Sequence, residues 1–477
     1  MIGDFLNEIQ NAMLSLEKGK KNAEKCPYRP QYHFLAPAYW MNDPNGLIFY
    51  KGEYHIFYQH NPYKDNFGKN ELWNTYWGHA KSKDLIHWEH LPIALLPSTE
   101  KGEYACWSGC CINDHGIPKI IYTSVNFKDI PHDYSEQWLA TSSDDLLTWK
   151  KDPNNPIMTL DLHKSLEIHD WRDPYVWYEQ NLWYMVLGGH QHKDEGVSHG
   201  MVLLYKSKDL VNWNYLHPLC KGTRKQGRGW ECPNFFQLNN RHILIVSPYK
   251  EVLYAVGIYK EHKFYPVEWK KLDLGRIFYA PNSMIDQNGR RILWGWIKGG
   301  GTGGWSGCLS LPRILTLGSD GEVRIKPAPE LELLRENHFK LENIKIGPKS
   351  SKIINFKNNF QLEILIELEL EKVNKIQLHA INKLELEEVN LIDYDASNNK
   401  IRVENEIGKL SLKEEQKNLR FHIFIDKSIL EVFINNKECI TTRIYPKVNE
   451  MNEFRLSVKS GRLSISSLDI WTLKSIW

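Results

Sequence analysis

One seven-residue pattern recurs along the first half of the chain, and it constrains the fold more than any other feature of the sequence. The pattern reads Ser-x-Asp-Leu-x-x-Trp and occupies residues 82–88, 143–149 and 207–213. A degenerate fourth copy ends at Trp269, so the closing Trp residues stand 61, 64 and 56 positions apart. The chain between the copies consists of short aromatic or β-branched runs bounded by Gly, Pro, Asn or Asp, which is typical of strands. A repeat of this length in a chain of short strands predicts the blades of a β-propeller.

Three acidic residues take comparable places within this repeat. Asp43, Asp173 and Glu231 each have a Trp within three residues before them and a Pro one or two residues after them. Each lies 38 to 45 residues before the Trp that closes its own repeat, and residues 278–282 would be the matching point of a fifth blade. Because the first strand of each blade lines the central channel of a propeller, equivalent points on different blades converge. The sequence therefore predicts that the three carboxylates share one pocket, and carboxylates held among aromatic rings are the groups that cleave glycosidic bonds.

The composition argues against several other classes of protein. The net charge of +2 gives no sign of a nucleic-acid partner, and the eight Cys residues include no Cys-x-x-Cys pair that would indicate zinc. The first residues lack a basic segment followed by an apolar run, and no stretch is apolar enough to span a membrane. Aromatic residues reach 12%, and while most of them are expected in sheet cores, some can stack on sugar rings. We therefore expect a cytoplasmic protein with no metal, no cofactor, no nucleic-acid partner and no membrane segment.

The length of 477 residues is too great for one ordinary core, so two domains are expected. Apolar residues at helical spacing predict a helix over residues 2–18, with Gly19 as its C-terminal cap. Near residue 326 a Pro-containing stretch leads into a short helix, and later strands of alternating hydrophobicity, such as 360–366, predict an antiparallel sandwich. The predicted organisation is a helical extension at 1–27, a propeller at 28–325, a linker with a short helix at 326–340 and a β-sandwich at 341–477.

Longer motifs surround these features in a fixed order. They occupy residues 40–46 (Trp-Met-Asn-Asp-Pro-Asn-Gly), 57–62, 77–80, 171–174 (Trp-Arg-Asp-Pro), 230–233 (Trp-Glu-Cys-Pro), 309–313 and 426–433. In these motifs the chain resembles glycoside hydrolase family 32, the invertase or β-fructofuranosidase family, from about residue 28 to the C-terminus. The resemblance implies an all-β fold, with a five-bladed β-propeller followed by a C-terminal β-sandwich, to which this chain adds a short N-terminal helix. It also implies hydrolysis of terminal β-D-fructofuranosides by a retaining double displacement.

The resemblance assigns a role to each acid by motif match. Asp43 would be the nucleophile, Glu231 the acid/base, and Asp173 the residue that holds fructose hydroxyls and stabilises the transition state. Arg172 would bind sugar and influence the neighbouring carboxylate. These roles require an ionised Asp43 surrounded by hydrogen-bond donors, a Glu231 whose pKa is raised by burial and nearby negative charge, and a separation of about 5–5.5 Å between the two carboxyl groups. Further contacts to the sugar are expected from Asn42, Gln59, Trp107 and Ser108.

The rim of the expected pocket departs from the family pattern. Trp73 matches an upstream pocket Trp, but Phe67-Gly68 is a competing match, and residues 63–70 look like an insertion. The Gly-rich loop 298–304 is short where the family often builds a wall from an aromatic residue. These departures concern the choice of substrate and leave the expected chemistry unchanged.

The substrate stays open among sucrose, sucrose 6-phosphate and short fructo-oligosaccharides, and Lys64, Lys69 or Lys298 could contact a phosphate. Fructosyl transfer, in which a sugar replaces water as the acceptor, is an alternative outcome of the same chemistry. A fructan-binding protein without catalysis is a second alternative, against which the intact acids argue. The expected partner is a small carbohydrate, and a homo-oligomer is left open.

Overall fold

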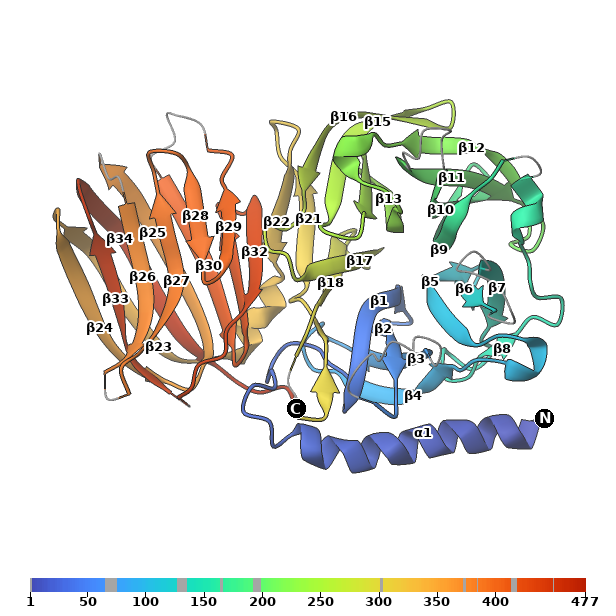
Figure 1. The fold of residues 1–477 in the computed structure, drawn as a ribbon, viewed down its shortest axis with the longest axis horizontal. Coiled ribbons are helices and arrows are strands. Elements are labelled where there is room, and N and C mark those ends of the chain that lie inside the picture. The colour runs from blue at the N-terminus through green and yellow to red at the C-terminus, as the bar shows by residue number, and fades with distance from the viewer. Residues whose placement is uncertain are drawn as a thin grey trace. The chain divides into compact units, whose positions relative to one another are not determined.

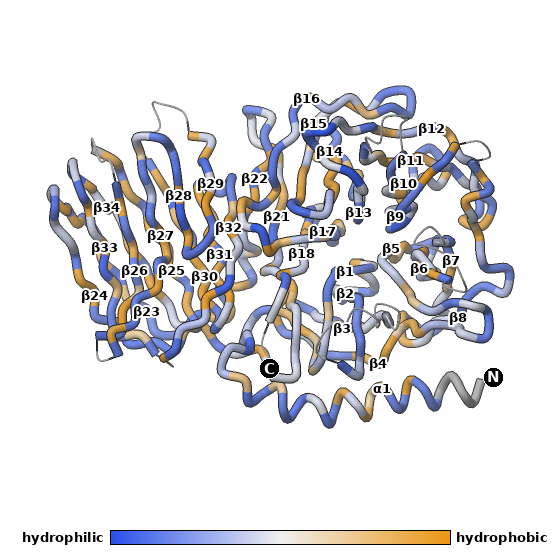
Figure 2. Tube along the Cα trace, in the orientation of Figure 1, coloured by the Kyte–Doolittle hydropathy of each residue, from blue (hydrophilic) through white to orange (hydrophobic). Residues whose placement is uncertain are grey.

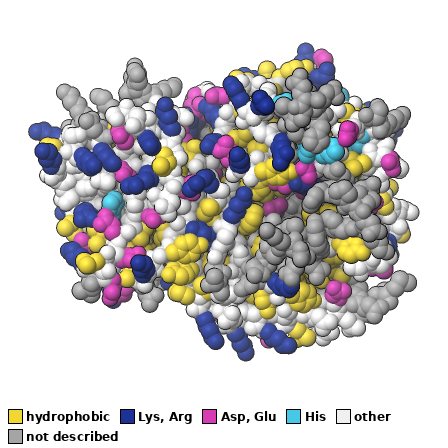
Figure 3. Space-filling view, in the orientation of Figure 1, with side chains coloured by type: hydrophobic (Ala, Val, Ile, Leu, Met, Phe, Trp, Pro, Cys, Tyr) yellow, Lys and Arg dark blue, Asp and Glu magenta, His cyan; other side chains and the backbone are white. Residues whose placement is uncertain are grey.

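The chain divides into two compact units that consist mostly of strands. The computed structural model describes residues 2–64, 75–126, 135–163, 166–191, 199–300, 303–371, 375–383, 385–412, 418–448 and 450–477. The first unit comprises residues 1–25, 35–271 and 279–323, and the second comprises residues 26–34, 272–278 and 324–477. Within the described residues, no helix combines the length and the apolar character needed to cross a bilayer. Basic and acidic side chains are interspersed over the face drawn in Figure 3.

Five sheets follow one another along the first unit and are arranged around a common centre (Figure 1). The first four are β1–β4 (Tyr39–Tyr50, Glu53–Asn61, Tyr76–Ser82, Glu89–Leu95), β5–β8 (Ala105–Asp114, Ile117–Val125, Ser135–Thr141, Lys150–Lys151), β9–β12 (His169–Glu179, Leu182–Gln191, His199–Ser207, Trp213–Lys221) and β13–β16 (Glu231–Leu238, Arg241–Ser247, Leu253–Lys260, Lys263–Lys271). The fifth contains β17 (Phe278–Ile285), β18 (Arg291–Ile297), β20 (Cys308–Leu309) and β21 (Arg313–Leu317). One late strand, β19 (Trp305–Ser306), pairs in parallel with the start of β1 and so belongs to the first sheet.

The first strand of each of the five sheets in the first unit lines the same cavity. β1, β5, β9, β13 and β17 all contribute to its lining, with Pro44, Gly109, Pro174, Pro233 and Pro281 among the residues. Points that are equivalent in the sequence repeat therefore lie around one centre.

The recurring pattern forms the turn between the third and fourth strands of three sheets. In the first copy, the carboxylate of Asp84 accepts two backbone N–H groups at 2.8 and 3.0 Å, and Leu85 adopts a left-handed φ of 70°. The indole N–H of Trp88 donates to the carbonyl of Leu85 at 3.0 Å, which fixes the buried ring to the turn. The same bond joins Trp149 to Leu146 and Trp213 to Leu210. The pattern is therefore a structural turn motif, and its Trp residues pack within the sheets.

The second copy of this turn is one residue longer than the alignment of the sequence implies. Asp144 accepts the hydroxyl of Ser142 at 2.9 Å, as Asp84 accepts the hydroxyl of Ser82 at 3.1 Å. The predicted start of this copy at Ser143 is therefore wrong by one position. An extra residue fits because the turn lies at the periphery of its sheet, where an added residue does not disturb the strand register.

The helix α1 (Ile2–Ala23) is longer than the sequence predicts. It passes through Gly19, which was expected to end it. A Cβ atom at Gly19 would lie 2.7 Å from the ring of Tyr39, so the glycine permits close packing just before the last turn of the helix. Lys20 and Lys21 lie in the last turn, where positive charge stabilises a helix end.

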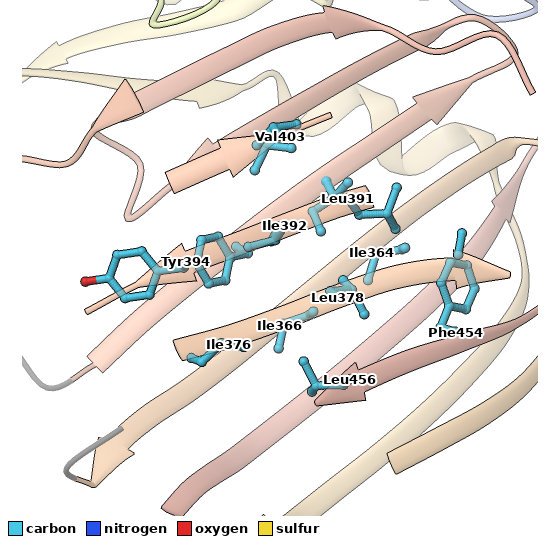
Figure 4. Close-up of a cluster of buried hydrophobic side chains, with 14 of the residues drawn as sticks. Ile364, Ile366, Ile376, Leu378, Leu391, Ile392, Tyr394, Val403, Phe454 and Leu456 are labelled. Carbon is cyan, nitrogen blue, oxygen red and sulfur yellow. The ribbon is translucent and has the colours of Figure 1, made fainter. Parts of the chain in front are cut away.

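Two six-stranded antiparallel sheets form most of the second unit. Their strand orders are β23-β34-β25-β30-β31-β32 and β24-β33-β26-β27-β28-β29. The strands are β23 (Arg335–Ile346), β24 (Ser350–Asn358), β25 (Gln361–Glu371), β26 (Lys375–Asn382), β27 (Glu387–Asp395), β28 (Lys400–Val403), β29 (Glu406–Lys409), β30 (Asn418–Asp426), β31 (Ile429–Ile434), β32 (Glu438–Arg443), β33 (Met451–Val458) and β34 (Arg462–Leu473). Ile364 and Ile366 of β25 share one buried core with Leu378 and Leu456 of the other sheet (Figure 4). The alternation of hydrophobic and hydrophilic residues along these strands is visible in Figure 2.

Two short segments, 26–34 and 272–278, belong to the second unit although the sequence places them within the first domain or at its edge. Three successive backbone N–H groups at residues 31–33 donate to the carboxylate of Asp426 at 2.6, 2.8 and 2.8 Å. Such a bond between residues nearly 400 positions apart leaves no local signal, so the predicted boundary at residue 28 does not follow the compact units.

The predicted linker at 326–340 contains more regular structure than expected. β22 (Val323–Pro327) precedes a 3-10 helix, η4 (Pro329–Leu334), in which Leu331 and Leu334 are buried. The long strand β23 then begins at Arg335, inside the predicted linker.

Candidate active site

Each of the three acids lies at an irregularity in the first strand of its sheet. The pairing register shifts within residues 41–44 on β1, 172–175 on β9 and 231–234 on β13. Each of these spans contains a Pro, which has no N–H to give to a strand ladder, and a bulge at such a point turns a side chain out of the regular alternation. Asp173 itself adopts a left-handed φ of 65°. The local sequence thus explains why these three side chains leave their sheets.

Within the part of the chain that the structure describes, two donors reach Asp43, and both contact the same carboxylate oxygen. The hydroxyl of Ser108 on β5 donates to its Oδ2 at 2.7 Å, and the thiol of Cys232 on β13 lies 3.5 Å from the same atom. Burial raises the pKa of Asp43 to about 7; the neighbouring Asp173 and Glu231 add to this rise, and the two donors oppose it. The expected donors are therefore present, but they do not hold the pKa of Asp43 low, because burial outweighs them.

Asp173 is the most enclosed of the three acids. Its side chain is only 7% exposed, and the backbone N–H of Cys232 donates to its Oδ2 at 2.9 Å. Its own N–H donates to the hydroxyl of Thr123 at 2.9 Å, which fixes the bulge. Burial raises the pKa of Asp173 to about 6, while the charge of Arg172 opposes and that of Glu231 supports the rise.

Glu231 is held between a cation and a phenol. Arg172 Nη2 donates to its Oε1 at 2.7 Å, and the hydroxyl of Tyr279 on β17 contacts its Oε2. The guanidinium of Arg172 also lies 5.3 Å from the centre of the Trp107 ring and 3.9 Å from Asp173. Arg172 therefore links the second carboxylate to the third.

Cys232, Asp170, Tyr249 and Tyr279 belong to this site but have no role assigned from the sequence. Asp170 Oδ1 accepts Arg172 Nη1 at 2.9 Å, and the hydroxyl of Tyr249 donates to Asp170 Oδ2. Burial alone would raise the pKa of Asp170, but His190, Arg172 and Tyr249 together hold it far below its ordinary value. Tyr279 lies within 278–282, the segment that the repeat marks as the fifth equivalent point, so the register could have singled it out.

Two of the predicted sugar-contact residues, Ser108 and Trp107, contact groups of this site. Ser108 contacts Asp43, as described, and Trp107 lies under Arg172 and accepts the indole N–H of Trp77 on its carbonyl at 3.0 Å. Gln59 is 4% exposed and donates to the carbonyl of Cys106 at 3.1 Å. The side-chain oxygen of Asn42 is buried and has no hydrogen-bond partner among the described residues. It is therefore a ready acceptor for a sugar hydroxyl.

Some predictions for the rim fall outside the described residues. Trp73, its competitor Phe67-Gly68, and Lys69 lie in the range 65–74. Lys64 is described, and its side chain is exposed.

Lys298 is the lysine that the structure brings to the carboxylates. Its Nζ lies 3.6 Å above the centre of the Tyr279 ring and 5.7 Å from that of Trp296. Burial lowers the pKa of Lys298, and the charges of Glu231 and Asp43 oppose that effect. The ammonium group therefore stands on the Glu231 side of the pocket.

Two family models account for nearly the whole chain. The model of the glycosyl hydrolases family 32 N-terminal domain matches residues 33–327, and the model of the family 32 C-terminal domain matches residues 330–472. The chain is 32% identical to a sucrose-6-phosphate hydrolase of Zymomonas mobilis, over 97% of this chain and 96% of the relative. It is 33% identical to a sucrose-6-phosphate hydrolase of Escherichia coli, over 98% and 99% of the two chains.

A solved structure shows the same fold. The crystal structure of fructan 1-exohydrolase IIa from Cichorium intybus superposes with a TM-score of 0.83 at 28% identity, covering 94% of this chain and 98% of the other.

Proposed function

The chain belongs to glycosyl hydrolase family 32, and we propose that it hydrolyses terminal β-D-fructofuranosides by a retaining double displacement. The observation that carries the proposal is the meeting of Asp43, Asp173 and Glu231, from three different strands, around one arginine and one shared thiol. No cofactor is needed for this reaction, because two carboxyl groups supply both the nucleophile and the proton. We place the enzyme in the cytoplasm, with a small carbohydrate as its partner.

The fold that we infer for this function is a five-bladed β-propeller followed by a β-sandwich. The five sheets of the first unit, whose first strands all line one cavity, would be the blades. The two facing six-stranded sheets of the second unit would be the sandwich.

In the first step, Asp43 attacks the anomeric carbon while Glu231 gives its proton to the leaving oxygen, so a fructosyl ester forms and the aglycone departs. Both donors to Asp43 among the described residues bond Oδ2, which leaves Oδ1 as the attacking oxygen. In the second step, Glu231 takes a proton from water, which attacks the same carbon and releases Asp43. Asp173 holds fructose hydroxyls through its Oδ1, because its Oδ2 is occupied by Cys232. Carboxylates around the ring favour the positive charge of the oxocarbenium-like transition state.

The substrate candidates are sucrose, sucrose 6-phosphate and short fructo-oligosaccharides. The position of Lys298 on the side of the proton donor favours a leaving group that carries negative charge. The relatives from Zymomonas mobilis and Escherichia coli, named as sucrose-6-phosphate hydrolases, agree with that choice. Fructosyl transfer has no specific observation in its favour.

A panel of sucrose, sucrose 6-phosphate, inulin oligomers and levan oligomers, with analysis of the released sugars, tests the proposal. We expect fructose release from at least one of them and a loss of about 10²–10⁴-fold in kcat for Glu231→Gln. Glu268→Gln serves as the matched control, because Glu268 is a 67% exposed glutamate on β16. Methanol as the acceptor should give methyl β-D-fructofuranoside if configuration is retained. No fructose from any substrate would overturn the function, and the α-methyl product would overturn the retaining mechanism alone.

A further inference from the structure

The hydroxyl of Tyr279 stands at a junction whose hydrogen bonds can be counted. A phenol has one hydrogen to donate and two lone pairs to accept with. Around this hydroxyl lie the backbone N–H of Tyr249 at 2.8 Å, the backbone carbonyl of Ser247 at 2.9 Å, and Oε2 of Glu231. The N–H can only donate and the carbonyl can only accept, so Glu231 alone can take either part.

The count differs between the two protonation states of Glu231. When Glu231 carries a proton on Oε2, Tyr279 donates to Ser247 and accepts from both Tyr249 and Glu231, and all three contacts are hydrogen bonds. When Glu231 is ionised, Tyr279 donates its single hydrogen to Oε2 of Glu231. No hydrogen then lies between the Tyr279 hydroxyl and the Ser247 carbonyl, so this contact is no longer a hydrogen bond. The protonated state therefore makes one more hydrogen bond at this junction than the ionised state.

We propose that Tyr279 is a positioning residue that retains the proton of Glu231 until the leaving oxygen takes it. The proton belongs on Oε2 because Oε1 faces the guanidinium of Arg172, which can only donate. After the proton transfer, the phenol of Tyr279 donates its hydrogen to the carboxylate of Glu231. When water returns a proton to Glu231, the phenol again donates to Ser247 and accepts from Glu231. This inference rests on the proposed function, since it assigns a partner to its acid/base.

The surroundings keep the phenol neutral and in place. Burial and the charge of Glu231 raise the pKa of Tyr279, so the hydroxyl keeps its hydrogen throughout. The ammonium group of Lys298 over one ring face and the edge-on contact with Trp296, whose ring centre is 6.5 Å away, restrain the ring. The titratable or charged groups that face Glu231 are Arg172 and Asp173 from β9, Asp43 from β1, Cys232 beside it on β13, Tyr249, Tyr279 and Lys298.

The pH dependence of kcat/KM for Tyr279→Phe tests the proposal, on the fructoside that the wild type cleaves fastest. The basic limb reports the loss of the acid's proton, so it should move to lower pH by about one unit, the worth of one hydrogen bond. The acid limb, set by Asp43, should stay in place, because Tyr279 has no contact with Asp43 among the described residues. Tyr265→Phe, which removes the hydroxyl of a 54% exposed tyrosine on β16, should match the wild type.

Three results would overturn the inference. A basic limb that moves upward would mean that Tyr279 donates to an ionised Glu231, and an unmoved limb would mean that the phenol serves structure alone. If Tyr279→Phe does not fold, infrared titration of the wild type decides, with Glu231→Gln to assign the band. The carboxylic-acid band assigned to Glu231 should lie at the position of an acid whose hydroxyl donates a hydrogen bond, and a band at the position of a free acid would overturn the inference. A wild type inactive on every fructoside would instead refute the proposed function.

Discussion

The two units each bury a group of carboxylates, and the groups differ in what surrounds them. In the second unit Asp426 and Glu431 are fully buried, and Asp426 accepts three backbone N–H groups besides the ring of His33. The same ring contacts Glu431 at 3.1 Å through its other nitrogen. In the first unit, the donors to Asp43 among the described residues are a hydroxyl and a thiol, and two further carboxylates lie close to it. A buried acid therefore indicates catalysis only when it has too few hydrogen-bond donors to stabilise its charged form.

The difference in hydrogen-bond donors gives the two groups of carboxylates opposite effects on stability. The carboxylates of the second unit hold the segment 26–34, so their charge supports the fold. Burial raises the pKa values of Asp43 and Asp173 in the pocket, so the ionisation of these two carboxyl groups opposes folding. Four predictions test this contrast.

The largest effect is expected for Asp43→Asn. Loss of the proposed nucleophile should lower kcat/KM by about 10⁴-fold or more. The folded pKa of Asp43 is raised to about 7, so as pH rises from its ordinary value of 3.8 toward 7 its ionisation reduces stability. At about pH 8 the variant should therefore unfold with a free energy equal to or up to about 3 kcal/mol above that of the wild type. Urea unfolding and steady-state kinetics on the same samples measure both, and a destabilised variant would contradict the contrast.

Asp426→Asn should show the reverse pattern. Three N–H groups and the His33 ring would face an amide in place of a carboxylate, which should lower the free energy of unfolding by about 3–5 kcal/mol. The folded fraction should keep the kcat of the wild type, since Asp426 has no part in the proposed chemistry. A stable variant would show that the N–H groups find other partners.

The ring of His33 gives the second unit its own dependence on pH. Burial alone would lower the pKa of His33, but its hydrogen bonds to Asp426 and Glu431 outweigh burial and raise it above 6.5. The resulting stability is fully present below about pH 6.5 and is lost as pH rises through the raised value. Urea midpoints measured from about pH 6 to about pH 9 should fall for the wild type, and His33→Gln should remove this component. If the urea midpoints fall equally in both proteins, the group whose titration changes the stability is not His33.

The smallest effect is expected for Ser108→Ala. The hydroxyl of Ser108 holds down the pKa of Asp43, so its removal should raise that pKa further. The acid limb of kcat/KM should then move to higher pH by about half a unit to one unit. Ser142→Ala, in the second repeat turn outside the pocket, is the matched control. An unmoved acid limb in Ser108→Ala would show that Asp43 does not set it.

What the sequence reveals depends on how far apart the interacting residues are. The acids could be found because a Pro beside each one marks the bulge locally, and the repeat places the bulges in register. The hydrogen bonds from residues 31–33 to Asp426 could not be predicted, because neither segment carries a sequence pattern that identifies the other as its partner. The end of helix α1 was predicted wrongly at Gly19, because the sequence does not distinguish a glycine that ends a helix from one that packs closely against the Tyr39 ring. Asp170 could not be singled out, because its role depends on Tyr249, a residue 79 positions away in the sequence, as well as on the nearby Arg172.

The pairing of β19 with the start of β1 bears on the order of events during synthesis. Tyr39 and Trp40 lie opposite Trp305 and Ser306, a few residues from Asp43. The strand that carries Asp43 can therefore pair with β19 only after the ribosome has made most of the first unit. A nascent chain released before residue 306 would hold all three acids yet lack this neighbour of β1. The onset of hydrolysis along a series of stalled chains would thus show whether activity requires the pairing of β19 with β1.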